Sequence, residues 1–83
     1  MSKLFIYQYI NNLKPDDIKD FGLKQNIVLS EQEIEIIYDY IKHKTKELFN
    51  NPLKVIAEIK DKVSIPVYNK ILELYNHYKN ILN

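Results

Sequence analysis

The stretch LSEQEI, residues 29–34, fixes where the central helix of this chain begins. The Ser30 hydroxyl is placed to accept the backbone N–H of Glu33, and the Glu33 carboxylate is placed to accept the N–H of Ser30. The leucine before this capping box and the isoleucine after it occupy the positions of a hydrophobic staple. We therefore expect a helix over about residues 31–48.

Two helices are expected before this stretch. The first covers about residues 2–13, where apolar residues recur with the period of a helix. The second begins at Pro15, because the first helical position needs no N–H and suits proline. Gly22 is placed to end this second helix in the left-handed conformation that glycine adopts without strain. Residues 26–29 then form an extended connection to the capping box.

Two more helices are expected after it. Asn51 is placed as a cap with Pro52 at the first helical position, which predicts a helix over about residues 52–63. The last helix, about residues 66–82, has the cleanest helical period in the chain. Five amphipathic helices with short connections predict an all-α fold, a compact orthogonal bundle of about five short helices that forms a single domain over residues 1–83.

The composition narrows the possible functions. The 83 residues include one glycine, no cysteine and twelve basic residues, all of them lysine. One glycine cannot build a phosphate-binding loop or the many tight turns of a barrel. The lack of cysteine excludes disulfides, thiolate nucleophiles and cysteine metal sites. Without arginine, the usual bidentate reader of phosphate and guanine is missing.

Charge is divided between the two halves of the chain. Residues 1–41 carry four lysines and seven acidic residues, a net −3, whereas residues 42–83 carry eight lysines and four acidic residues, a net +4. The halves are expected to attract each other within the fold or head to tail between molecules. Because the overall charge is only +1, nucleic acid is not the partner that we expect.

The hydrophobic residues give no sign of a membrane segment. No stretch approaches the length of apolar sequence that crosses a bilayer. The apolar run near the N-terminus is short, is broken by Gln8 and has no small-residue cleavage site after it, so it is interpreted as a helix and not as a signal peptide. We expect a cytoplasmic protein without a membrane partner.

Candidate ligands and catalytic groups are few. Asp39, His43 and Glu47 are spaced four residues apart on one face of the expected helix, a spacing at which two ligands can hold a metal ion. We favour the alternative, a solvated helix face with modest ion pairs, for these residues and for His77. No hydroxyl residue comes with a base. We therefore expect no catalytic residue, no metal and no cofactor, and no small-molecule substrate is evident.

A helix-turn-helix is an alternative that the helix pattern allows. The expected second and third helices are joined by about seven residues, longer than the three or four that the motif usually has. The would-be recognition helix begins with Glu31, Glu33 and Glu35, which a phosphate backbone would repel. A small nucleic-acid-binding accessory protein of helix-turn-helix-like type stays as the second interpretation.

One apolar pair does not fit a single core. Ile36 and Tyr40 lie four residues apart, on the side of the expected third helix away from Ile34 and Ile41. Either the first or the fifth helix covers them, or they form a surface for a partner or a second copy of the chain. We take this pair as the candidate interaction surface.

Several of these motifs form a familiar pattern. LKPDDI at 13–18, FG at 21–22, IVLSEQE at 27–33 and NP at 51–52 precede a closing amphipathic helix. Together they resemble a family of short uncharacterised all-helical proteins of low-GC Gram-positive bacteria, over roughly residues 8–82. The resemblance implies a helical bundle in a bacterial cytoplasm and brings no activity, cofactor or catalytic residue.

These observations favour one class of function. The chain has caps and apolar helix faces but no cluster of residues with a recognisable chemistry. We therefore expect a non-enzymatic helical module that works by protein–protein interaction, with another protein or with itself.

Overall fold

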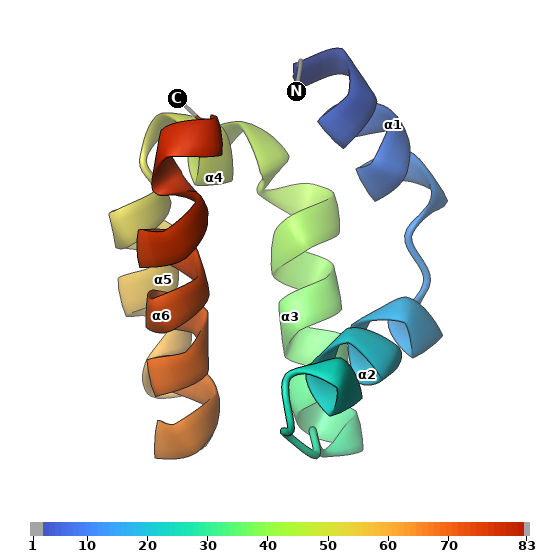
Figure 1. Ribbon diagram of the computed structural model, residues 1–83, viewed down its shortest axis with the longest axis vertical. Coiled ribbons are helices and arrows are strands. Elements are labelled where there is room, and N and C mark those ends of the chain that lie inside the picture. The colour runs from blue at the N-terminus through green and yellow to red at the C-terminus, as the bar shows by residue number, and fades with distance from the viewer. Residues whose placement is uncertain (1–2, 83) are drawn as a thin grey trace.

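The chain folds into helices alone over the residues that the computed structural model describes, which are 3–82, with side chains for 7–77 and Lys79 (Figure 1). The elements are α1 Lys3–Asn12, α2 Pro15–Lys24, α3 Glu31–His43, α4 Thr45–Asn50, α5 Pro52–Ile59 and α6 Ile65–Leu82. The predicted all-α bundle is confirmed, with six helices in this part of the chain where five were expected. The expected start of the first helix at residue 2 lies outside the described residues.

The helices form two layers that α4 connects. In the view of Figure 1, α2 crosses the lower end of α3 and α1 lies beside its upper end. α4 turns the chain over at the top, after which α5 runs down and α6 runs back up against it. We call α1–α3 the N-terminal layer and α5 with α6 the C-terminal layer.

The capping box at the start of α3 forms as the sequence predicts. The Oγ atom of Ser30 accepts the N–H of Glu33 at 3.1 Å, and Oε1 of Glu33 accepts the N–H of Ser30 at 3.0 Å. Leu29 packs against the cluster that contains buried Ile34, as expected of the hydrophobic staple. These contacts fix the first turn, where backbone N–H groups lack partners within the helix.

The Glu33 carboxylate also reaches the C-terminal layer. Its other oxygen, Oε2, accepts the N–H of Ser64 at 2.8 Å, directly before α6 begins. Partial burial by itself would raise the pKa of Glu33, but the hydrogen bonds from Ser64 and Ser30 outweigh burial and lower the pKa below 4.5. One charged side chain therefore caps α3 and connects it to the start of α6.

The end of α2 differs from the sequence prediction. Gly22 lies inside the helix without a positive φ, and the left-handed residue is Asn26, with a φ of 63°. The N–H of Ile27 donates to Gly22 O at 2.9 Å and the N–H of Asn26 donates to Leu23 O at 3.0 Å, which are the two bonds of a Schellman motif. The predicted role of Gly22 is therefore wrong. Asn26 occupies the left-handed position instead, since asparagine also tolerates this conformation.

Gly22 instead permits a close approach of the chain to α2. This residue is buried, and a Cβ atom built on it would lie 3.0 Å from Cδ1 of Leu29 and 3.2 Å from the carbonyl oxygen of Ile27. Both separations are shorter than the optimal distance between non-bonded atoms. The missing side chain lets the connection to α3 fold back directly on α2.

The prediction of one continuous helix over residues 31–48 is wrong, because the helix breaks at Lys44. Lys44 has φ −120° and ψ 32°, outside the helical region. The hydroxyl of Thr45 donates to the carbonyl of Ile41 at 2.6 Å, a local bond of the kind that bends helices. The Nζ atom of Lys44 also donates to Glu58 Oε2 at 3.2 Å, which holds the bend against α5.

The expected fourth helix is shorter than predicted. Pro52 starts α5 as expected, but the helix ends at Ile59, and the N–H of Lys62 bonds to Ile59 O at 2.8 Å in the turn that follows. Asn51 is the N-cap residue of α5, as expected, but its side chain makes no capping hydrogen bond. The early end of α5 leaves Lys62 and Ser64 in a turn, from which both reach α3.

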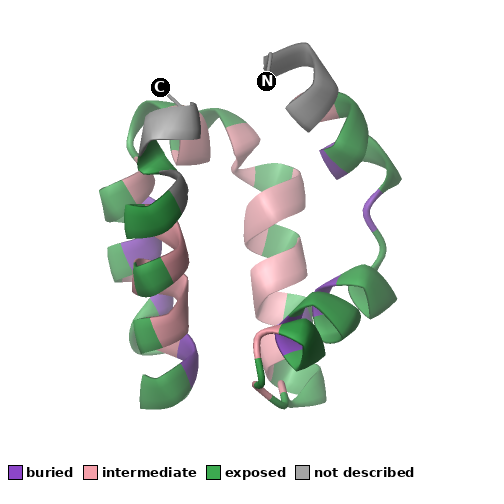
Figure 2. Cartoon of the chain, in the orientation of Figure 1, coloured by how far each residue is buried: buried purple, intermediate pink, exposed green. Residues whose placement is uncertain are grey.

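Buried residues occur on both layers of the fold (Figure 2), and Ile10 of α1 is one of them. One group, built around Leu13, Ile18 and Ile34, holds α2 against α3. Another lies in the C-terminal layer and consists of Val55, Ile56, Ile59 and Val67. Each layer therefore has hydrophobic contacts of its own.

Replacing Gly22 with alanine tests the close approach. Alanine gains about 0.5–1 kcal/mol of helix propensity, but its methyl group would press on Leu29 and on the Ile27 carbonyl, and overpacking costs about 1–3 kcal/mol. We expect Gly22→Ala to lower the free energy of unfolding by about 1 kcal/mol in urea titration. The same change should cost less in a Leu29→Ala background, and equal costs in both backgrounds would contradict the contact.

Acid should weaken the bonds that Glu33 makes. Because folding lowers the pKa of Glu33, their contribution is fully present above the unfolded pKa and is lost as the pH falls through the folded pKa. Below pH 4.5 we expect the free energy of unfolding to fall less steeply in Glu33→Gln than in the wild type. Glu35→Gln, at an exposed position of α3, is the matched control and should keep the wild-type slope. Identical slopes in all three proteins would count against the bridge to Ser64.

Candidate functional site

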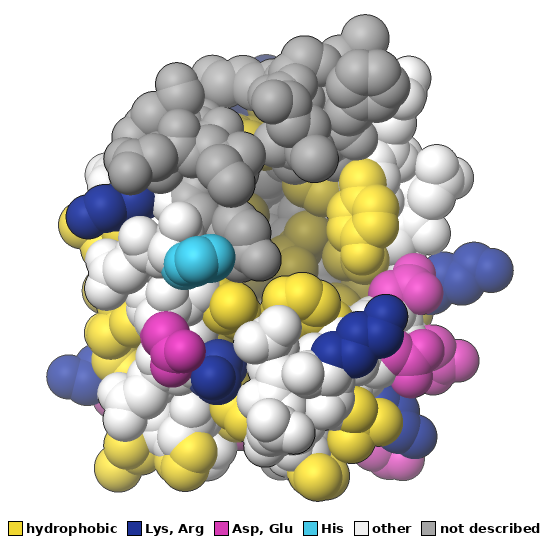
Figure 3. Space-filling view, viewed as in Figure 1, with side chains coloured by type: hydrophobic (Ala, Val, Ile, Leu, Met, Phe, Trp, Pro, Cys, Tyr) yellow, Lys and Arg dark blue, Asp and Glu magenta, His cyan; other side chains and the backbone are white. Residues whose placement is uncertain are grey.

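A hollow of about 440 Å³ lies between the two layers, in the centre of the face shown in Figure 3. It exists because α2 packs on α3 and α6 packs on α5, which leaves space between the two pairs. We call it the interlayer groove. The N-terminal layer and its connections contribute Tyr9, Ile10, Leu13, Asp17, Ile18, Phe21, Gly22, Gln25, Ile27, Leu29, Ile37, Tyr40 and Ile41. The rest of the lining is Leu48, Pro52, Val55, Ile56, Ile59, Val67, Lys70, Ile71, Leu74 and Tyr75.

The groove has the chemistry of a binding site for an apolar occupant. Among the lining residues that the structure describes, two are charged, Asp17 on α2 and Lys70 on α6. Binding pockets are typically concave spaces of about 300–1,000 Å³, mostly apolar, with a few polar groups that fix orientation. The lining that the structure describes therefore suits an apolar ligand.

Two aromatic side chains at the mouth of the groove are open to solvent. Tyr9 is 64% exposed and Phe21 is 45% exposed, although both line the groove. Water in contact with such apolar surface costs about 25 cal/mol for each square ångström. Exposed aromatic residues beside an apolar hollow are typical of a surface that another molecule covers.

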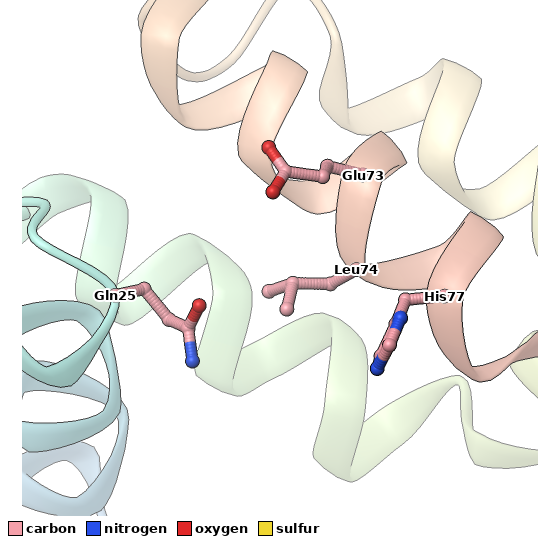
Figure 4. A pocket seen from close by; sticks show the side chains of 4 residues that line it. All are labelled: Gln25, Glu73, Leu74 and His77. Atoms are coloured by element: carbon pink, nitrogen blue, oxygen red, sulfur yellow. The ribbon is translucent and has the colours of Figure 1, made fainter.

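A smaller polar recess of about 250 Å³ adjoins the groove between α6 and the end of α2 (Figure 4). Figure 4 shows Leu74 pointing from α6 toward Gln25, with Glu73 and His77 on the same helix as Leu74. Gln25 and Leu74 line both spaces, so the recess and the groove are continuous. Lys70 Nζ pairs with the Glu73 carboxylate at 3.3 Å, which gives this side of the groove a polar rim.

The structure places the two residues of the predicted surface pair differently. Tyr40 lines the groove, and its hydroxyl accepts a hydrogen bond from Lys62 Nζ at 2.8 Å. The Nζ atoms of Lys44 and Lys62 lie 5.1 and 5.0 Å from the centre of the Tyr40 ring. Ile36 is half-buried and is not part of the groove lining. Tyr40 therefore belongs to the groove, and the role of Ile36 as a contact residue stays a prediction.

The bend at Lys44 separates the residues that were weighed as metal ligands. Asp39 and His43 share a turn of α3, where His43 Nδ1 lies 3.2 Å from the Asp39 carbonyl oxygen. Glu47 lies beyond the bend, on α4. Contrary to the expectation from their spacing, the three residues therefore do not share one continuous helix face. Among the residues that the structure describes, no group of three His, Asp or Glu side chains could hold a metal ion.

Comparison of the chain with protein-family models, curated proteins and solved structures finds no match. The resemblance to a family of low-GC Gram-positive bacteria therefore stays a prediction. Within residues 3–82, no helix combines the length and the hydropathy that crossing a membrane requires. The groove has to be interpreted from its own geometry.

A double-mutant cycle tests the position of Tyr40. Tyr40→Phe removes the acceptor of the Lys62 hydrogen bond, and we expect it to lower the free energy of unfolding by about 0.5–1.5 kcal/mol. Lys62→Met removes the donor, so the double variant should cost less than the two single variants together. Additive costs, measured by urea titration, would contradict this bond between α3 and the turn after α5.

Proposed function

We propose that this protein is a non-enzymatic helical module that binds another protein chain in the interlayer groove. The observation that carries the proposal is the groove itself, about 440 Å³ of apolar space with exposed Tyr9 and Phe21 at its mouth. Removing apolar surface from water is the main source of free energy in protein association. A partner that covers this surface therefore gains affinity without any chemical step.

The walls of the groove favour an α-helix as the occupant. One side is formed by α2 and α3 and the other by α5 and α6, so a further helix lying along the groove would pack its side chains against both (Figure 1). Such a helix would place apolar residues at i, i+3, i+4 and i+7 into the groove. Its polar face would lie near Asp17, Lys70 and the recess beside α6.

The alternative expected from the sequence, binding to nucleic acid, has less support. Binding to phosphates needs lysines that are available at the surface. Four lysines of the basic half have acceptors within the fold: Lys42 donates to a backbone carbonyl at 2.9 Å, Lys44 to a carboxylate at 3.2 Å, Lys62 to a hydroxyl at 2.8 Å and Lys70 to a carboxylate at 3.3 Å. Protein binding in the groove is therefore the function that we propose.

A charge introduced at the mouth of the groove tests the proposal. Phe21→Glu would put a carboxylate where the apolar partner docks, and burying an unpaired charge is strongly unfavourable. We expect this variant to lose the proteins that the wild type retains from an extract of the native cell. Val28→Glu is the matched control, because Val28 is 83% exposed and lies outside the groove.

Circular dichroism should show the same helical content in the wild type and both variants, so that a lost fold is not mistaken for a lost site. A protein retained by the wild type and by Val28→Glu, but not by Phe21→Glu, supports the groove as the binding site. The same set of retained proteins for all three chains would contradict it.

A further inference from the structure

We propose that a second copy of this chain closes the interlayer groove, in place of a separate helix, with its own groove facing the first across a two-fold axis that runs along the groove. This inference rests on the proposed function and names the partner. Each copy would cover the exposed Tyr9 and Phe21 of the other, and neither groove is complete without the second copy.

The solvent-accessible area of the chain is larger than expected for a monomer of its mass, as it would be for a single subunit of a dimer. A monomeric protein of 10.0 kDa is expected to expose about 5,200 Å², whereas this chain exposes 6133 Å². Its radius of gyration, 12.1 Å, is close to the value of about 11.8 Å for a compact domain of this length. An elongated shape therefore does not explain the difference. The excess of about 900 Å² matches one partner's share of a standard interface, about 800 Å².

The two sides of the groove belong to halves of opposite charge. The N-terminal layer lies almost entirely within residues 1–41, with a net charge of −3, and the C-terminal layer lies within residues 42–83, with a net charge of +4. A rotation of 180° about an axis along the groove sets the basic layer of each copy against the acidic layer of the other. Complementary charge selects this arrangement over one in which like layers meet.

The two charged residues of the groove lining would fix the register of the pair. Asp17 and Lys70 lie on opposite sides of the groove, on α2 and α6. Within one chain, Asp17 Oδ2 accepts the N–H of Lys14 at 2.9 Å and Lys70 pairs with Glu73 at 3.3 Å. In the two-fold arrangement, Asp17 of each copy faces Lys70 of the other, which gives two equivalent ion pairs between the copies.

Charge reversal separates pairing between chains from pairing within a chain. Asp17→Lys makes both contacts of the dimer Lys–Lys, and Lys70→Glu makes both Asp–Glu, so each variant alone should dissociate about tenfold or more readily than the wild type. In a 1:1 mixture of the two variants, both contacts join opposite charges again. We expect the mixture to form a heterodimer with an affinity close to that of the wild type, measured by analytical ultracentrifugation over a range of concentrations.

Two control variants test whether charge reversal outside the groove also weakens the dimer. Asp16→Lys changes the same helix turn as Asp17→Lys, and Lys54→Glu changes an exposed lysine of α5; neither position lines the groove. Both controls should dimerise as the wild type does, and circular dichroism should show that every variant keeps its helices. Phe21→Glu should be monomeric at concentrations where Val28→Glu is a dimer.

Each of the following outcomes would overturn the inference. A wild type that stays monomeric at all concentrations excludes the second copy, as does a dimer that Phe21→Glu leaves intact. Variants that weaken the dimer but do not recover on mixing exclude the two-fold pairing of Asp17 with Lys70. A monomer whose Phe21→Glu variant still loses a retained protein would refute self-association and leave the proposed function standing. A monomer that binds a fluorescent fatty acid in the groove would assign the space to an acyl chain instead.

Discussion

The carboxylate of Glu33 is the interaction on which the arrangement of the two layers depends. One oxygen accepts a backbone N–H at the start of α3, and the other accepts the backbone N–H of Ser64 at the start of α6. Helix starts carry N–H groups without partners and a partial positive charge, so a single anion stabilises both. The start of α3 is thereby joined to the residue directly before α6.

The interlayer groove follows from how the layers are joined. Besides the Glu33 bridge, the polar connections between the layers include the hydrogen bond from Lys62 to Tyr40 and that from Lys44 to Glu58. These are directional polar bonds at the edges of α3, and they set a distance between the layers without filling the space between them. Hydrophobic burial is concentrated within each layer, and the apolar faces that remain line the groove.

Local signals predicted the helices, and contacts between distant residues decided the rest. The capping box at Ser30 and the proline at position 15 set helix starts by bonds within a few residues, so both predictions are confirmed. The break before Thr45 depends partly on Glu58, fourteen positions after Lys44, and periodicity alone does not reveal it. The groove depends on the separation of two layers, which no local pattern encodes. Phe21 lines the groove and is 45% exposed, a property set by the tertiary arrangement that no local pattern encodes.

The presence of buried residues on each layer has a consequence for the order of folding. The cluster around Ile18 and Ile34 joins segments close in sequence, and so does the group that includes Val55 and Val67. Contacts between near neighbours lose little chain entropy on closure, so helical hairpins of this kind form quickly. Each layer is in this sense a folding unit of its own. Docking of the two layers then becomes the last step, and it is the step at which layers from two different chains can exchange partners during synthesis or refolding.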